Sequence, residues 1–295
     1  MARYPEDLDR WRRAGRIGAE ARELGARLAV PGASRREVAE AIEGYIRSQG
    51  AEPSFPANLS RNDEAAHYTP SPDDDATLAE GDVLKIDVGA HLDGAISDTA
   101  MTVEVGGGHR FERLIRASRE GLEAGIARVR PGVSVDDIGR AVERAVHALG
   151  FKPVENLTGH TIERYLLHAG ISVPNVGGLS NAVLEEGQVV AIEPFATNGA
   201  GAIENGPFGN IVRFRGDPGP RDAGVAALWE RYRTLPFTAR WLDEQERASL
   251  RTARRTLQVY PVFMEQARGT VAQSEHTVLI VPGGVEILTR ASDAG

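Results

Sequence analysis

Residues 78–87 read Leu-Ala-Glu-Gly-Asp-Val-Leu-Lys-Ile-Asp, and residues 184–193 read Leu-Glu-Glu-Gly-Gln-Val-Val-Ala-Ile-Glu. Each stretch has a polar turn containing glycine, then an apolar run with β-branched residues, and then an acid. This is the pattern of a buried strand that follows a turn. The match predicts two related halves, each of which brings one carboxylate, Asp87 or Glu193, to the end of a buried strand.

The similarity extends beyond these strands. Residues 31–50 and 131–150 each contain a Pro-Gly pair, a capping serine, apolar residues at helical spacing and a terminal glycine. A short polar segment follows each helix, and a second acid lies eleven residues after each strand acid. These paired landmarks are Asn58-Leu-Ser with Asn156-Leu-Thr, and Asp98 with Glu204. Landmarks in the same order indicate a duplication, which would place a shared cleft between the halves.

The composition is that of an acidic globular chain without cysteine. Hydrophobic residues make up 41% of the 295 residues and the formal net charge is −8, which argues against global disorder and against direct nucleic-acid binding. The absence of cysteine excludes disulfides, a thiol nucleophile and iron–sulfur clusters, so any metal must be held by His, Asp and Glu. No segment resembles a signal peptide or a membrane span. We therefore expect a cytoplasmic protein that makes no membrane contact.

The second half is longer than the first, between Glu204 and Thr270. The expected elements there are a loop over residues 209–224, helices over 226–233 and 243–257, and a closing strand over 271–281. We therefore expect one domain of the α+β class, with halves near residues 1–105 and 106–295. A helical insertion over residues 207–265 would lie within the second half.

Asp87 and Asp98 are expected on the two arms of a hairpin. A loop over residues 91–94 would pair Ala90 with Ala95 and place the two acids opposite each other, with Cβ atoms roughly 4.5–5.5 Å apart. Like charges at that distance repel unless a shared proton or a divalent cation neutralises them. Two solvent-facing acids on an edge hairpin are the alternative interpretation.

Three further residues complete a candidate metal site. The duplication would bring Glu193 towards Asp87, and Glu275 lies in the expected closing strand. His160 follows a glycine, which lets the backbone approach a crowded centre, although a lone histidine is more often an ordinary core or surface residue. Two Asp, two Glu and one His carry four negative charges, which match two divalent cations of Co, Mn, Fe or Zn. Such paired metals activate water and polarise a carbonyl group, which indicates hydrolysis.

A set of short motifs runs from about Ala14 to the end of the closing strand. They are Phe55-Pro-Ala-Asn-Leu-Ser60, Ala65-Ala-His-Tyr-Thr-Pro70, Lys85-Ile-Asp-Val-Gly89, Gly94 to Thr99, Gly159-His160, Leu167-His-Ala-Gly170, Ala191-Ile-Glu-Pro-Phe195, Thr234-Leu-Pro-Phe237, Arg240-Trp241 and Glu275-His-Thr277. Together they resemble the type II methionine aminopeptidases, and the length is similar to that of the archaeal members. The resemblance implies the pita-bread fold, a pseudo-symmetric duplication of two α/β halves with a helical insertion.

The resemblance also implies roles for individual residues. The ligands of two metal ions would be Asp87, Asp98, His160, Glu193 and Glu275, with the second and the last bridging both ions. His67 and His168 would act in catalysis and substrate binding by contacting the scissile peptide, Glu193 would also shuttle a proton, and Phe55 would line the methionine pocket. Ser274 departs from the family, which usually has an aromatic residue there. Because neighbouring strand residues face opposite sides, we expect Ser274 to lie behind the site.

These inferences predict a dinuclear metalloaminopeptidase that removes the initiator methionine from nascent proteins when the second residue is small. Its partners would be nascent N-termini, including those at the ribosome, and nothing in the sequence calls for an obligate partner, so we expect a monomer. One alternative is a prolidase or aminopeptidase P, which usually carries an additional N-terminal domain. The other is a non-catalytic binding protein on the same fold, which the complete ligand set disfavours.

Overall fold

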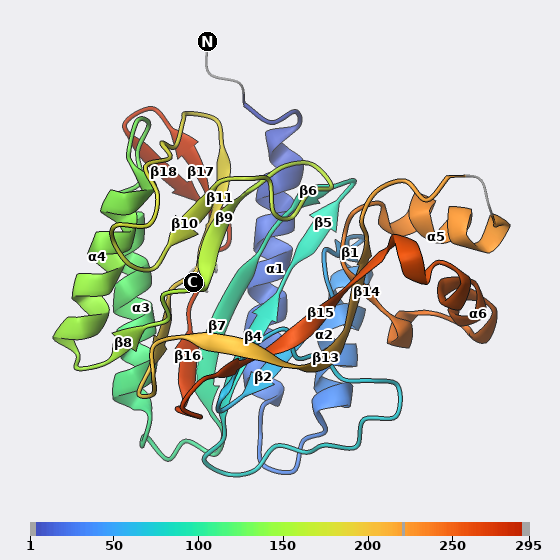
Figure 1. Cartoon of the computed structure of the whole chain (residues 1–295), viewed down its shortest axis with the longest axis horizontal. Coiled ribbons are helices and arrows are strands. Elements are labelled where there is room, and N and C mark those ends of the chain that lie inside the picture. Colours follow the sequence, from blue (N-terminus) through green and yellow to red (C-terminus); the bar gives the residue numbers. More distant parts are fainter. Residues whose placement is uncertain (1–3, 220–221, 291–295) are drawn as a thin grey trace.

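Two pairs of helices pack against the strands that carry the acids. The computed structural model describes residues 4–219 and 222–290, and in it α1 and α2 cover one group of strands while α3 and α4 cover another (Figure 1). The elements of the first half are α1 (Leu8–Leu28), α2 (Arg35–Ser48), β1 (Glu52–Pro53), β2 (Asn58–Arg61), β3 (Glu64–Ala66), β4 (Val83–Val88), β5 (Ala90–Leu92), β6 (Ala95–Ile96) and β7 (Thr99–Glu104). Within the described residues, no helix has the length and apolarity needed to cross a membrane.

The second half repeats this order and then extends it. Its elements are α3 (Glu112–Ile126), α4 (Val135–Ala148), β8 (Lys152–Pro153), β9 (Thr158–Ile162), β10 (Ser172–Pro174), β11 (Val189–Ile192), β12 (Phe195–Thr197), β13 (Ile203–Phe214), α5 (Ala223–Tyr232), β14 (Phe237–Thr238), η1 (Ala239–Trp241), α6 (Glu244–Thr252), η2 (Arg254–Thr256), β15 (Leu257–Glu265), β16 (Val271–Gln273), β17 (His276–Val281) and β18 (Gly284–Ile287). Figure 1 shows β13 and β15 crossing between the halves and α5 and α6 beside them.

The helices α2 and α4 begin and end as the repeated sequence pattern predicts. The side chains of Ser34 and Ser134 each accept a hydrogen bond from a backbone N–H of the first turn. Gly50 and Gly150 follow the helices with φ of 71° and 80°, a left-handed conformation that glycine adopts without strain. The apolar residues at helical spacing are buried against β2 and β4 in the first half, and against α3, β11 and β12 in the second. The prediction for both helices is confirmed.

The acids lie where two central strands end. Strands β2-β4-β7 form one sheet and β10-β9-β11-β17-β18 form another, and both β4 and β11 are buried along their whole length. Asp87 lies near the end of β4, and Glu193 directly follows β11. A backbone bridge joins the sheets, because Glu275 N–H donates to the carbonyl oxygen of Ala100 at 2.9 Å. The junction between the halves therefore fixes the backbone of Glu275.

The loop of the β5–β6 hairpin begins two residues later than expected, so it is two residues shorter. It consists of Asp93 and Gly94, with φ of 50° and 83°, which is the two-residue turn with positive φ that suits a twisted hairpin. Ala95 consequently pairs with Leu92, so the expected pairing of Ala95 with Ala90 is wrong.

The register of the acids shifts accordingly. Asp87 lies opposite Ala100, so the prediction that it lies opposite Asp98 is wrong. Because strand side chains alternate with a period of two, a shift of two residues leaves both acids on the same face. They are diagonal neighbours, and the expected proximity of their side chains survives the error.

The segment expected to be a loop over residues 209–224 begins as a strand. β13 continues to Phe214 and pairs with β15, and the pairing has register shifts on both sides of Phe208. Glycine and proline in this stretch accompany these irregularities, which is why the composition resembled that of a loop. The prediction of a loop up to residue 214 is wrong.

Two other expected elements are shorter than predicted. The helix expected over residues 243–257 ends at Thr252, and β15 begins at Leu257 after a short 3₁₀ turn. The closing strand expected over residues 271–281 is interrupted, because β16 ends at Gln273 and β17 begins at His276. Glu275 therefore lies between two strands and belongs to neither of them.

A buried ion pair attaches the segment after β14 to the first half. Arg240 donates from Nη2 to Glu43 Oε1 of α2 at 2.8 Å, and Trp241 Nε1 donates to Glu43 Oε2 at 2.7 Å. The side chains of Arg240 and Glu43 are only 4% and 1% exposed. Glu43 also accepts from the backbone N–H of Ala57 at 3.1 Å, so the same carboxylate anchors the start of β2.

Replacing Glu43 by glutamine should destabilise the protein by about 3–5 kcal/mol, because Arg240 would be left buried without its counter-charge. Glu40→Gln, on the exposed face of the same helix, should change stability by less than about 0.5 kcal/mol. Urea unfolding followed by circular dichroism measures both variants. Equal stability of Glu43→Gln and the wild type would contradict this account of the ion pair.

Candidate metal centre and active site

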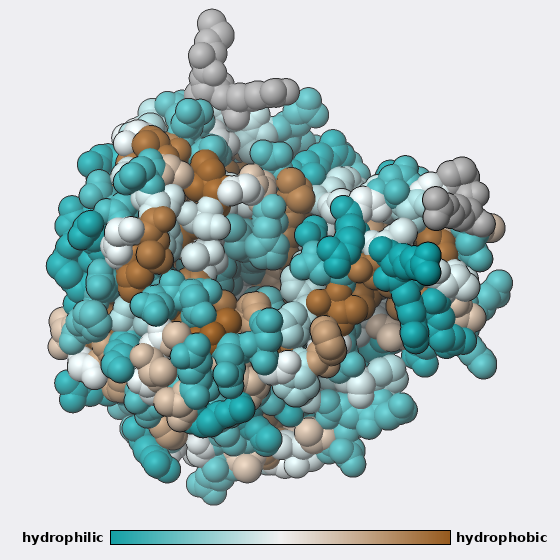
Figure 2. Space-filling view, in the orientation of Figure 1, coloured by the Kyte–Doolittle hydropathy of each residue, from teal (hydrophilic) through white to brown (hydrophobic). Residues whose placement is uncertain are grey.

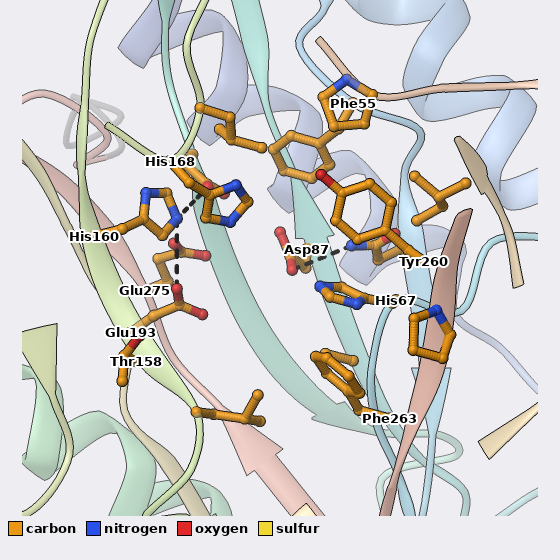
Figure 3. A pocket seen from close by; sticks show the side chains of 18 of the residues that line it. Phe55, His67, Asp87, Thr158, His160, His168, Glu193, Tyr260, Phe263 and Glu275 are labelled. Carbon is orange, nitrogen blue, oxygen red and sulfur yellow. Dashed lines mark hydrogen bonds and ion pairs between the residues drawn. The ribbon is translucent and has the colours of Figure 1, made fainter. Parts of the chain in front are cut away.

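A cavity of about 530 Å³ lies where the two halves meet the β13–β15 ribbon (Figure 2). Among the residues that line it are all of the site residues expected from the sequence: Phe55, His67, Asp87, Asp98, His160, His168, Glu193 and Glu275. They come from both halves of the chain, and Figure 3 shows their side chains directed into one space.

One group of acids gathers around His160. Ligand atoms of Asp98, His160 and Glu275 all lie within 4.8 Å of one another. His160 Nε2 lies 3.5 Å from Asp98 Oδ2 and 3.5 Å from Glu193 Oε1. Asp87 lines the same cavity, and its pKa responds to the charge of Asp98. The structure therefore brings together the four acids and the histidine that the sequence singled out.

The four carboxyl groups destabilise one another in their charged forms. Burial raises the pKa of Asp98 to about 7. For Asp87, burial and then the charge of Asp98 raise the pKa well above its usual value. Burial is also the main cause of the raised pKa of Glu193 and of Glu275, and the neighbouring acids add to it. Four negative charges can occupy this space only when protons or cations neutralise them.

Several carboxylate oxygens point into the cluster without a protein partner. Among the described residues, both Oε atoms of Glu275 and Oδ1 of Asp87 are buried and accept no hydrogen bond. Asp87 Oδ2 receives only long bonds, from Asn58 Nδ2 and Gln273 Nε2 at 3.4 Å each. Unpartnered buried acceptors are costly, and hard or borderline divalent cations are bound by this type of oxygen ligand. The residues therefore fit a metal site.

His160 is prepared to act as a neutral ligand. Burial lowers its pKa to about 4, and its Nδ1 lies 3.4 Å from the carbonyl oxygen of Thr161, while Nε2 faces the acids. Gly159 allows this approach, because a Cβ atom at that position would collide with the carbonyl oxygen of Ala191 in the paired strand β11. The expected reason for a glycine before this histidine is confirmed.

His67 and His168 lie on opposite walls of the cavity (Figure 3). Burial, and then the charge of His168, lowers the pKa of His67 to about 4, and the His67 ring packs against Phe263 with centroids 4.4 Å apart. His168 is exposed towards the cavity. Burial of its imidazole among the protein groups of the cavity, and then the charge of His160, lower its pKa well below the usual value. Both imidazoles are therefore neutral at neutral pH.

Two threonines hold the backbone beside the acids. Thr277 Oγ1 accepts from the N–H of Asp98 at 2.8 Å and donates to the carbonyl oxygen of the same residue at 2.7 Å. Thr99 Oγ1 donates to the carbonyl oxygen of Glu275 at 2.9 Å. These bonds cross between the halves, so they fix Asp98 and Glu275 relative to each other.

Several residues that line the site were not predicted from the sequence. Asn58 and Gln273 contact Asp87, and two signals could have identified them: Asn58 belongs to the repeated polar segment, and Gln273 is two residues from Glu275. The wall formed by β13 and β15 was also not predicted. Ile211 and Arg213 fall in the expected loop over residues 209–224, and Gln258, Tyr260 and Phe263 fall in a part of the expected insertion to which no strand was assigned. Glu204, which was paired with Asp98, is exposed and lies 3.7 Å from Arg268.

Ser274 lies behind the site, as expected from strand alternation. Its hydroxyl oxygen is 2.9 Å from that of Ser118 in α3, and both residues are buried. Ser118 Oγ also donates to the carbonyl oxygen of Ile115. A neighbouring polar side chain therefore occupies the space behind Glu275.

The chain is similar to known proteins over almost its whole length. The model of metallopeptidase family M24 matches residues 9–282. The methionine aminopeptidase of Pyrococcus abyssi is 46% identical over 295 residues, which covers 96% of this chain and 99% of that protein. The methionine aminopeptidase of Methanocaldococcus jannaschii is 40% identical over 285 residues, with 94% and 96% covered.

Solved structures share the fold at lower identity. Methionine aminopeptidase from Thermotoga maritima gives a TM-score of 0.74 at 24% identity and covers 98% of this chain and 100% of that one. A thermophilic Arx1 gives 0.85 at 17% identity, with 99% and 93% covered. Prolidase from Pyrococcus furiosus gives 0.67 at 17% identity, and the match covers 99% of this chain and 66% of that one.

Metal should stabilise the protein through Glu275. Without metal, Glu275→Gln removes one repelling charge, so its Tm should be at or above that of the wild type. Excess Mn²⁺ should raise the wild-type Tm. At a Mn²⁺ concentration of a hundred times the Kd, binding should add about 2.7 kcal/mol to the free energy of unfolding, and the Tm of the variant should rise much less. Calorimetry with EDTA and with Mn²⁺ measures this, and the exposed Glu204→Gln is the control. Equal metal responses of Glu275→Gln and wild type would contradict the site.

An aromatic residue at position 274 should not fit beside Ser118. Ser274→Phe should destabilise the protein by about 1–3 kcal/mol through overpacking, and Ser118→Gly should partly restore stability in the double variant. Ser274→Ala should cost only about 1 kcal/mol, because Ser118 keeps its bond to Ile115. Thermal unfolding distinguishes these variants. A Ser274→Phe protein as stable as the wild type would mean that the space behind Glu275 is larger than the Ser118 contact indicates.

Proposed function

Because the chain belongs to metallopeptidase family M24, we propose that it is a methionine aminopeptidase, which removes the initiator methionine from proteins. It has the pita-bread fold of this family. The observation that carries the proposal is full-length similarity to methionine aminopeptidases together with a buried cluster of acids and one histidine that fits metal. The motifs resemble those of the type II enzymes.

The five clustered residues would hold two divalent ions of Co, Mn, Fe or Zn. The proposed ligands are Asp87, Asp98, His160, Glu193 and Glu275. When bound, the ions would polarise the scissile carbonyl group and lower the pKa of a water molecule. The protein's own contribution is to exclude bulk water from the acids and to hold them with unpartnered oxygens directed at one point.

Three side chains would act on the substrate. Glu193 would accept a proton and return it to the leaving amine, as a carboxylate does in general acid–base catalysis. His67 and His168 are neutral, so each can donate one N–H to the scissile peptide without adding a positive charge to the site. Their position on opposite walls suits contacts with both sides of that peptide.

The apolar part of the cavity would accept the methionine side chain. Phe55, Leu167 and Ile211 line it, so a methionine side chain placed among them would move from water into apolar surroundings. We propose that the residue after methionine must be small. The physiological partner would be the N-terminus of a nascent chain, which the protein meets in the cytoplasm, at the ribosome, as a monomer.

Peptide cleavage tests the proposal. Protein stripped with EDTA should be inactive on Met-Ala-Ser and should become active when Mn²⁺ or Co²⁺ is restored. The value of kcat/KM for Met-Ala-Ser should be at least roughly 100-fold higher than that for Met-Leu-Ser, and nothing should be released from Ala-Pro. Each tenfold step in kcat/KM corresponds to about 1.4 kcal/mol of transition-state binding.

Each competing function gives a different result in the same assay. Faster cleavage of Ala-Pro than of Met-Ala-Ser would identify a prolidase or aminopeptidase P. Tight binding of Met-Ala-Ser without turnover, with both metals present, would identify a non-catalytic binding protein. Either result would overturn the proposal.

A further inference from the structure

The segment that carries His168 is held at its two ends, and within it Glu163 and Leu166 exchange two backbone hydrogen bonds of 2.9 Å that close a turn. It connects β9 to β10 and contains Leu167 and His168, which both line the cavity. On its far side, Ala169 N–H donates to the carbonyl oxygen of Thr161 at 2.7 Å, which ties the segment back to β9. On the N-terminal side of His168, the segment is held at Tyr165. The residues that hold Tyr165 lie outside the sheet that contains β9 and β10.

That attachment is the tip of the β5–β6 hairpin of the first half (Figure 1). Tyr165 N–H donates to the carbonyl oxygen of Gly94 at 3.0 Å, and Tyr165 OH donates to Asp93 Oδ1 at 2.9 Å. Arg164 Nε donates to the Asp93 carbonyl oxygen at 2.8 Å, and its Nη2 also reaches the Asp93 carboxylate. Arg10 Nη1 of α1 donates to the same carboxylate at 2.6 Å.

Asp93 is thus the meeting point of three side chains. Its own side chain is 51% exposed, and a single exposed ion pair contributes little to stability. The three side-chain contacts converge on one carboxylate at a two-residue turn, so one substitution removes all three and leaves the bonds to the carbonyl oxygens of Asp93 and Gly94. Their effect should therefore appear in the position of the attached segment more than in global stability.

Tyr165 needs such support because its backbone is strained. Its φ is 59°, in the left-handed region that residues with a Cβ atom rarely adopt. Gly94 lies against its ring so closely that a Cβ atom on the glycine would collide with it. On the other side, Thr234 Oγ1 donates to the carbonyl oxygen of Tyr165. Tyr165 is therefore fixed between the first half and the segment before β14.

We infer that Asp93 is a positioning residue, which holds Tyr165 and thereby sets Leu167 and His168 against the substrate. The clamp consists of Asp93, Gly94, Tyr165 and Thr234. The inference rests on the proposed function, because it assigns the clamp to the same substrate cavity. It follows from geometry, because the chain enters the cavity wall two residues beyond the strained Tyr165. Beyond His168, Ala169 and Ile171 tie the segment to Thr161.

The first experiment compares Asp93→Ala, Asp93→Asn and the control Asp136→Ala. Asp136 also accepts from an arginine, Arg140 Nε at 2.7 Å, and from a backbone N–H, but it lies on α4 and does not line the cavity. Asp93→Ala should lower kcat/KM for Met-Ala-Ser by roughly 10- to 100-fold, because displacement of a contacting group has effects of that size. Asp93→Asn keeps the turn and a neutral acceptor, so its loss should be smaller.

Three readouts separate positioning from a general loss of structure. Bound metal per chain should be unchanged in Asp93→Ala, because none of the proposed ligands belongs to the clamp. Discrimination between Met-Ala-Ser and Leu-Ala-Ser should decrease, because Leu167 moves with His168. Backbone hydrogen exchange should become faster within residues 163–168 in Asp93→Ala and stay as in the wild type in Asp136→Ala.

Thr234→Val provides a second variant that leaves the hairpin intact. It removes the hydroxyl that binds the Tyr165 carbonyl, and it should produce the same faster exchange in residues 163–168 with a smaller loss of kcat/KM. Unchanged exchange and kinetics in folded Asp93→Ala, or equal losses in Asp136→Ala, would overturn the inference. Hydrogen exchange needs no catalysis, so a wild-type protein that fails to cleave Met-Ala-Ser would refute the proposed function while the clamp is still tested.

Discussion

Four carboxyl groups buried around one cavity set the physical constraint on which this structure depends. No folded chain can keep Asp87, Asp98, Glu193 and Glu275 charged and unpaired in such a space, so cations or protons must balance them. Neutral His160 adds a nitrogen that could bind a cation without bringing another charge. The glycine before it and the rigid strand ends follow from the same need, which is to bring several ligands to one point.

The hydrogen bonds that join the two halves are made by the same segments that carry the acids. The backbone of Glu275 pairs with Ala100, while Thr99 and Thr277 bond across the same boundary. A displacement of one half against the other would therefore separate Asp98 from Glu275. Because this coupling runs through backbone bonds of the ligand-bearing segments, packing between the halves and the arrangement of the acids cannot vary independently.

Local patterns in the sequence predicted the parts of the fold that depend on local physics. Capping serines, helical spacing and the two strand acids were correct, and a register error of two residues did no harm to Asp87 and Asp98 because strand faces repeat every two residues. The repeat failed at Glu204, because beyond β12 the second half departs from the first. In the structure, Glu275 and not Glu204 is the counterpart of Asp98. This relation is set by pairing between strands that are distant in sequence, so no local spacing encodes it.

The duplicated frame and the single-copy segments have different tasks. Each half contributes acids at the end of its central strand, so duplication alone can generate a cluster of charge. The ribbon of β13 and β15 has no counterpart in the first half, yet Ile211 and Tyr260 in it form the wall that faces His168. Substrate choice should therefore reside in these unrepeated segments, and the frame by itself specifies a hydrolytic centre without specifying which N-terminus enters it.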